Sequence, residues 1–299
     1  MTLPPIVKLC ASPVTLKNLL MSAGIMKSHE INRAALMSQI SYSLDHSIVW
    51  KDMLVSHDPP IRGVSIPLSR NLVGDKGYIN VVYAIKDNDC FIAYSGTSDH
   101  EYWIYNVDCS TCFLNGLTLH RGFTRMAQEV HQTLTNRYDE SDKLGNILNE
   151  NNINRVIHSG HSAGGAVAGI MPLLLKDGRD HVVIDFGTPR YLSTSGSNRF
   201  KRKYPYPRYR FQELYDLVPC IPLSWRGPFP DFIHFGENNY TTPAHKIINK
   251  LPWWRPLRMI SKYFKSLYLH GPIDEVIKHH SMLNYLTSVI CKTDQRDFS

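Results

Sequence analysis

The sequence predicts an α/β fold with a mostly parallel central sheet flanked by helices. Apolar strand-like segments alternate with helix-like segments, which is the order typical of parallel sheets. One short motif also marks a strand that passes through a sharp turn into a helix. The chain has 299 residues, 43% of them hydrophobic, which is enough for a sizeable core. We therefore expect a single domain over residues 1–299.

The first 60 residues are predicted to form a helical N-terminal layer. Apolar side chains recur near a 3.6-residue period between Ser28 and Leu44, and Ser28 is a suitable helix N-cap. The pattern then changes to strands. Two β-rich segments on either side of the polar turn at 86–89 predict a hairpin over residues 78–94.

The later elements keep the alternation of helices and strands. In order, they are an amphipathic helix over 122–137, a polar stretch over 139–154, a strand over 155–158, a helix over 163–170, and strands over 182–186 and 208–214. Short strands separated by helices favour a sheet with parallel pairing in its centre.

The segment around Ser162 carries the clearest chemical motif. Gly160-x-Ser162-x-Gly164 is the pattern of a nucleophile elbow, and the flanks have the strand and helix character that such an elbow needs. The two glycines leave room for the strand and the helix to approach closely. An oxyanion that develops beside the serine can be met by the backbone amide of Ala163 and by the helix dipole.

A serine nucleophile needs a base, and the base needs an acid that orients it. Asp216 is the best-placed acid, because its strand ends there and Val218-Pro219 turns the chain. Asp185 is weaker because it lies inside an apolar strand. Asp231 lies in a proline-rich loop with no strand ahead of it.

The base should come late in the chain, as in enzymes with the order serine, acid, histidine. His279 and His280 are the leading candidates, and their position alone does not choose between them. The fallback histidines are His234, His245 and His270.

Five motifs in a fixed order point to one family. They are Tyr94-Ser95-Gly96-Thr97, His120-Arg121-Gly122-Phe123, Gly160 to Ala166, Phe186-Gly187-Thr188-Pro189-Arg190 and Asp216-Leu217-Val218-Pro219. Together they resemble the class 3 lipase family, which contains fungal triacylglycerol lipases and plant acylhydrolases. The spacing of His280 and Tyr285 resembles a late H-x-x-x-x-Y pattern of some members. The resemblance covers about residues 35–286.

This resemblance implies an α/β-hydrolase fold and a serine ester hydrolase that cleaves lipid esters, a phospholipase A or a lipase. It implies Ser162 as the nucleophile, Asp216 as the acid and His280 as the base, with His279 as a neighbour to test. The oxyanion donors would be Thr97 and Ala163. Acyl transfer by such a triad requires no metal and no cofactor.

The chain departs from the family at two positions of these motifs. Ser95 stands where the family usually has an arginine, which removes a charge that often fixes the oxyanion loop. Ala163 replaces the common leucine after the nucleophile, so the amide is kept while the local packing changes. Neither departure removes a catalytic group.

Charge and aromatic residues suggest where the substrate comes from. The net charge is +7 and the pI is about 9.0, which favours an anionic partner surface. Basic segments at 199–210 and 246–265, the second within a basic aromatic insertion over 238–273, favour peripheral contact with an anionic membrane. Residues 98–119 take the place of a lid, or pack as part of the core. A lipid ester is the expected substrate, with phospholipid favoured over triglyceride.

The sequence also bears on the alternative functions and on where the protein is located. A non-catalytic lipase-like interaction or signalling module is the alternative to an enzyme. No nucleic acid is expected as a partner, because no recognisable binding motif accompanies the basic charge. The chain has no recognisable secretory signal or spanning segment, and its six scattered cysteines are typical of free thiols. We therefore expect a cytoplasmic or peripheral membrane protein, with non-classical export left open.

Overall fold

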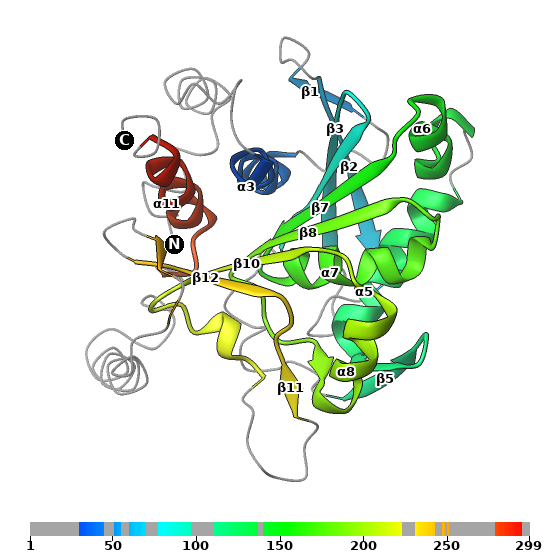
Figure 1. Cartoon of the computed structure of the whole chain (residues 1–299). Helices are drawn as coiled ribbons and strands as arrows, with labels where there is room; N and C mark the ends of the chain where they lie inside the picture. The colour runs from blue at the N-terminus through cyan, green and yellow to red at the C-terminus, as the bar shows by residue number, and fades with distance from the viewer. Residues whose placement is uncertain are drawn as a thin grey trace.

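The structure is a computed structural model. It describes residues 30–44, 51–54, 60–69, 77–96, 110–136, 140–222, 231–242, 247–248, 250 and 279–294. A large sheet runs through the molecule, with helices on both of its faces (Figure 1).

The large sheet has nine strands in the order β1-β2-β3-β4-β7-β8-β10-β12-β13. Its strands are β1 (Lys51–Leu54), β2 (Ile61–Leu68), β3 (Gly77–Lys86), β4 (Asp89–Tyr94), β7 (Arg155–His161), β8 (Asp180–Phe186), β10 (Arg208–Glu213), β12 (Glu237–Thr241) and β13 (Ile247–Ile248). The pairs from β4 to β12 are parallel, and the pairs at both ends of the sheet are antiparallel. Because parallel strands end at one edge, the turns that follow β4, β7, β8 and β10 gather there.

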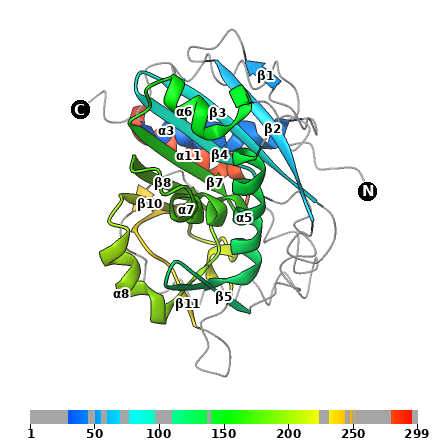
Figure 2. The same ribbon diagram turned by 90° about the vertical axis from the view of Figure 1, so that its right-hand side faces the viewer.

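Helices cover both faces of this sheet. The helical elements are α3 (Glu30–Ile40), η2 (Ser41–Ser43), α5 (Arg121–Thr135), η3 (Glu140–Asp142), α6 (Leu144–Glu150), α7 (Ala163–Leu175), α8 (Thr194–Lys203), η4 (Val218–Cys220) and α11 (Met282–Asp294). Helices α5 and α7 lie on one face, and α3 and α11 lie side by side on the other (Figures 1 and 2). No helix in the described part of the chain combines the length and apolar character needed to cross a membrane.

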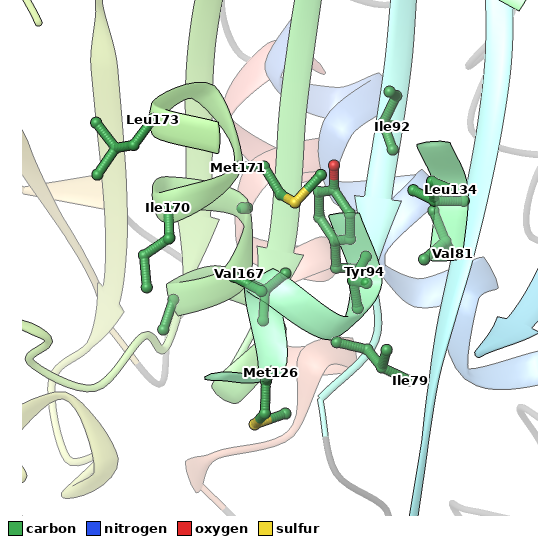
Figure 3. Close-up of a cluster of buried hydrophobic side chains, with 14 of the residues drawn as sticks. Ile79, Val81, Ile92, Tyr94, Met126, Leu134, Val167, Ile170, Met171 and Leu173 are labelled. Atoms are coloured by element: carbon green, nitrogen blue, oxygen red, sulfur yellow. The ribbon is translucent and has the colours of Figure 1, made fainter. Parts of the chain in front are cut away.

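The core between the sheet and helices α5 and α7 is the larger of two hydrophobic clusters. Side chains of β3 and β4, such as Ile79 and Tyr94, meet Met126 from α5 and Val167 from α7 (Figure 3). Helix α7 is buried along almost its whole length, as expected for a helix that is apolar all round. This packing fixes the start of α7 against the sheet.

The other face of the sheet has its own core beneath α3 and α11. Met37 and Ile40 from α3 and Tyr285 and Leu286 from α11 are all buried there, against strand residues such as Phe186. The first and the last described helices therefore support the same side of the sheet.

A second, four-stranded sheet lies beside the first, in the order β11-β9-β6-β5. It contains β5 (Thr111–Leu114), β6 (Leu117–His120), β9 (Leu192–Ser193) and β11 (Phe232–Ile233). The turn between β5 and β6 is Asn115-Gly116, with φ of 53° and 84°, which is a favoured hairpin turn. Residues 110–119 of the expected lid segment thus form a hairpin. Phe113 is 72% exposed, and residues 98–109 lie outside the described residues.

The predicted fold class is confirmed, as are the hairpin over 78–94 and the strands over 182–186 and 208–214. The helix predicted over 122–137 is α5, which ends at Thr135. The helical prediction for residues 1–60 is wrong at Lys51–Leu54, because this segment pairs with β2 at the sheet edge. The polar stretch over 139–154 contains α6, whose few apolar side chains are buried. Of the expected insertion over 238–273, residues 238–241 belong to β12, and residues 251–273 lie outside the described residues.

Candidate active site

Ser162 occupies the turn between β7 and α7. Its backbone has φ 59° and ψ −130°, a conformation that non-glycine residues rarely adopt. The turn is held by two backbone hydrogen bonds: Ser162 donates its N–H to the carbonyl of Phe186 at 3.0 Å, and Gly165 donates to the carbonyl of Ser162 at 3.0 Å. The serine side chain is buried, and its hydroxyl has no hydrogen-bond partner among the described residues.

The glycines of the motif are required by close backbone contacts. A Cβ atom on Gly160 would lie 2.4 Å from the carbonyl carbon of Gly164. A Cβ atom on Gly164 would lie 2.2 Å from the carbonyl oxygen of Tyr94, at the end of β4. The strand, the helix and the end of β4 therefore approach one another more closely than any larger residue allows.

Asp216 and His280, hereafter the acid–base pair, lie at the edge of the sheet where the parallel strands end. Asp216 follows β10, and His280 precedes α11. His280 Nδ1 is 2.7 Å from Asp216 Oδ2, and both side chains are buried. The carboxylate also accepts the N–H of Val218 at 2.9 Å and the hydroxyl of Tyr285 at 2.5 Å. Such a network fixes the rotamer of the acid and, through it, the plane of the imidazole.

The acid–base pair is close to the serine turn. The ring of His161, the residue before Ser162, has its centroid 4.4 Å from that of His280. A Cβ atom on Gly187, which follows β8 with φ 58°, would lie 3.0 Å from both Asp216 Oδ2 and His280 Cε1. A nucleophile, an imidazole and a carboxylate are thus gathered at one edge of the sheet, which is the set that acyl transfer requires.

The predicted oxyanion donors are described only in part. Ala163 is the first residue of α7, so its amide belongs to the N-terminus of a helix. Thr97 lies outside the described residues. Its neighbour Gly96 is described, and a Cβ atom on Gly96 would lie 3.0 Å from Ser162 Cβ. The end of β4 therefore reaches the serine turn.

The other candidate histidines lie elsewhere or in different pairs. His279 Nδ1 is 3.4 Å from Glu213 Oε2, so this histidine faces another carboxylate than Asp216. His234 Nε2 contacts the carbonyl of Pro219 at 2.5 Å, and burial lowers its pKa well below the ordinary value. His245 and His270 lie outside the described residues.

The contacts of the other two candidate acids involve other groups than His280. Asp185 is buried and its Oδ2 accepts from Arg208 Nε and Nη2 at 3.1 Å and 2.9 Å, while Arg210 Nε is 3.5 Å from Oδ1. Asp231 begins the segment that contains β11, and its backbone carbonyl accepts the N–H of Thr194 at 2.9 Å.

The ion group around Asp185 corrects one expectation about the basic segment 199–210. Arg208 and Arg210 are 4% and 1% exposed, so neither can meet a membrane surface. Burial lowers the pKa of Arg210 to about 10, while the charge of Asp185 opposes that shift. Arg199, Arg202 and Lys203, on α8, are exposed. Arg199 donates to the carbonyl of Gly116 at 3.0 Å and Lys203 to that of Asn115 at 3.1 Å, in the β5–β6 turn. Of the segment 246–265, the structure describes residues 247, 248 and 250.

Two residues that the sequence did not point to lie at the site. Tyr42, from the N-terminal 3-10 helix η2, contacts His161 and Gly96. Glu213, the last residue of β10, donates its backbone N–H to the Tyr285 hydroxyl at 2.9 Å. Neither residue lies in a motif, so the sequence carried no signal for them.

Comparisons with known proteins find one matching family and several solved structures of similar fold. Residues 91–225 match the lipase (class 3) family. The fold is also similar to that of the Lip2 lipase from Yarrowia lipolytica, with a TM-score of 0.54 and 18% identity, over 70% of this chain and 77% of that one. The triacylglyceride lipase of Rhizomucor miehei is similar with a TM-score of 0.52 and 20% identity, over 75% of this chain and 81% of that one. A triacylglycerol lipase from Penicillium expansum is similar with a TM-score of 0.52 and 17% identity, over 74% of this chain and 80% of that one.

These matches confirm the resemblance to class 3 lipases and the α/β-hydrolase fold. The matched residues 91–225 contain the serine turn and the acid of the acid–base pair. The family match supports a serine ester hydrolase of the lipase type, and the solved structures show the shared fold.

Proposed function

We propose that this chain, which matches the class 3 lipase family, hydrolyses carboxylic esters of lipids through Ser162, Asp216 and His280. The observation that carries the proposal is the buried contact of 2.7 Å between His280 Nδ1 and Asp216 Oδ2, beside a serine in a strained turn. In this scheme Asp216 holds the imidazole with its Nδ1 protonated, which leaves Nε2 to act as the base.

The reaction proceeds in two acyl-transfer steps. His280 takes the proton of the Ser162 hydroxyl while the serine oxygen attacks the ester carbonyl, and the protonated imidazole then gives that proton to the departing alcohol. Water attacks the acyl-enzyme with the same base, and the fatty acid leaves. The amide of Ala163 and the amide and hydroxyl of Thr97 stabilise the oxyanion in both steps.

We further propose that the substrate is phospholipid at an anionic surface. The support is the basic face of α8, which consists of Arg199, Arg202 and Lys203. Helix α8 contains no acidic residue. It lies at the same end of the molecule as the β5–β6 hairpin that carries the exposed Phe113 (Figure 2). Cationic side chains near an exposed aromatic ring suit the interface of an anionic bilayer.

The test measures fatty-acid release from anionic phospholipid vesicles, from zwitterionic vesicles and from a triglyceride emulsion. Ser162→Ala should reduce turnover by at least about 10⁴-fold, because no other group replaces the nucleophile. Release should be fastest from anionic vesicles. Faster release from triglyceride would keep the triad and refute the phospholipid preference. No turnover of any ester by folded wild type would refute the enzyme and favour an interaction module.

A charge variant tests the surface separately. Arg199→Gln/Arg202→Gln should weaken binding to anionic vesicles while hydrolysis of a short soluble ester stays unchanged. The matched control, Lys86→Gln/Lys143→Gln, removes the same charge at the end of β3 and just before α6, away from α8 (Figure 2). Equal loss of vesicle binding in both variants would show that only net charge matters.

A further inference from the structure

Tyr42 enters the site from the N-terminal part of the chain. Its hydroxyl oxygen is 2.9 Å from the amide nitrogen of Gly96, at the end of β4, and 2.8 Å from Nδ1 of His161, next to Ser162. It thus joins the strand end that leads to Thr97 to the turn that carries the nucleophile.

The directions of these two hydrogen bonds follow from the groups involved. The Gly96 N–H can only donate, so the Tyr42 oxygen accepts it. The phenolic hydrogen then points to Nδ1 of His161, which must accept it as an unprotonated nitrogen. The opposite assignment would leave the phenolic hydrogen without an acceptor among the described residues. Burial also raises the pKa of Tyr42, so the phenol keeps this hydrogen. His161 is therefore neutral, with its own proton on Nε2.

The charge of His161 matters because of its neighbour. The centroid of its ring lies 4.4 Å from that of His280 and 5.8 Å from that of Tyr285. Titratable groups of the described residues that face His161 include Tyr42 from η2, His280 before α11 and Tyr285 within α11. A charged His161 would oppose the imidazolium that His280 becomes in each acyl-transfer step, because like charges at this distance repel strongly in a buried site.

The contact with Gly96 requires a glycine and is supported from the same side. A Cβ atom on Gly96 would lie 2.4 Å from the Tyr42 oxygen, so only glycine leaves room for the hydroxyl. Asn80 donates its side-chain amide to the carbonyl of Ser41 at 2.9 Å, and its backbone exchanges two hydrogen bonds with Ser95. The 3-10 helix that presents Tyr42 is therefore fastened to the strand end that it orients.

We propose that Tyr42 is a positioning residue for acyl transfer, whose hydroxyl holds the Gly96 amide in place and keeps His161 neutral beside His280. This inference rests on the proposed roles of Ser162, Asp216 and His280. Tyr42 itself touches no reacting atom.

The kinetic test compares wild type with Tyr42→Phe on a soluble p-nitrophenyl ester between pH 5 and 9. The variant should lose up to about 100-fold in kcat with little change in KM, since the site is misaligned rather than blocked. The acid limb of its pH–rate profile should become steeper than that of wild type, because His161 can then take up a proton of its own at Nδ1. In the double variant Tyr42→Phe/His161→Gln, the acid limb should regain the slope that it has in wild type, while kcat stays low. Tyr83→Phe, which removes the hydroxyl of another buried tyrosine, bonded to Arg62, is the control.

Two results would overturn the proposal. One is a Tyr42→Phe enzyme with unchanged kcat. The other is a loss of kcat that is equal at every pH, with the same shape of pH–rate profile in Tyr42→Phe and in the double variant. Long-range proton–nitrogen NMR of the imidazoles, assigned with His161→Gln, provides a readout without turnover. It should find Nδ1 of His161 unprotonated in wild type, and a protonated Nδ1 at pH 7 refutes the inference. An enzyme without turnover but with this tautomer would instead refute the proposed function.

Discussion

Replacing Asp185 by asparagine should destabilise the protein without slowing the folded enzyme. Its carboxylate contacts Arg208 at 2.9 Å and 3.1 Å and Arg210 at 3.5 Å, and all three side chains are at most 4% exposed. Neutralising this carboxylate leaves two guanidinium groups buried without the charge that pairs with both. Breaking a buried ion pair in this way costs about 3–5 kcal/mol, a large part of the roughly 5–15 kcal/mol that stabilises a domain.

The assay combines urea unfolding, followed by circular dichroism, with kcat/KM per folded enzyme. Asp180→Asn is the matched control, because it makes the same change at an exposed position on the same strand. Asp216→Asn should behave in the opposite way to Asp185→Asn. Its folded fraction should lose about 10³–10⁴-fold in kcat, because the base loses the acid that orients it.

Two results would refute this reasoning. A loss of less than about 1 kcal/mol in Asp185→Asn would mean that the buried arginines do not depend on this carboxylate. A fall in kcat as large as that of Asp216→Asn would mean that the acid has been assigned to the wrong aspartate.

Three further predictions concern the site and its support. Gly187→Ala should lower kcat by about 10- to 100-fold, because its Cβ atom would press on the acid–base pair; Gly178→Ala has a similar positive φ but open space around it, and should leave kcat unchanged. Tyr285→Phe should lower kcat with little effect on KM, since Asp216 loses a hydrogen bond of 2.5 Å; an unchanged kcat would contradict this. Burial lowers the pKa of His158 far below its ordinary value, so the unfolded chain takes up a proton near pH 6.5 that the folded chain does not. Stability should therefore fall below that pH, by up to about 1.4 kcal/mol per pH unit, and His158→Gln should show a shallower dependence in urea midpoints.

The serine turn was predictable because its causes are local. Gly160 and Gly164 are explained by contacts with backbone only a few residues away or at the end of β4. The order of strands and helices in the middle of the chain was predictable for a similar reason, since each element carries its own periodicity. The position of Asp216 followed from the end of its strand.

Other features depend on segments far apart in the sequence. Strand β2 contains Gly63 and Pro67 and has no clear alternation, yet its eight-residue pairing with β3 makes it a strand. The contacts of Tyr42 with Gly96 and His161 arise only once α3 has packed on the sheet. The carboxylate that His279 faces, Glu213, is likewise set by tertiary packing and not by any motif.

The pairing of α3 with α11 has a consequence for the time at which reactivity appears during synthesis. The serine turn is made from the middle of the chain, whereas His280 enters with α11, which must find α3 and the underlying sheet before it can dock. In a chain made from its N-terminus, His280 is thus the last of the three proposed catalytic residues to be added. The proposed catalytic set is therefore complete only once α11 has packed on α3 and on the sheet beneath it.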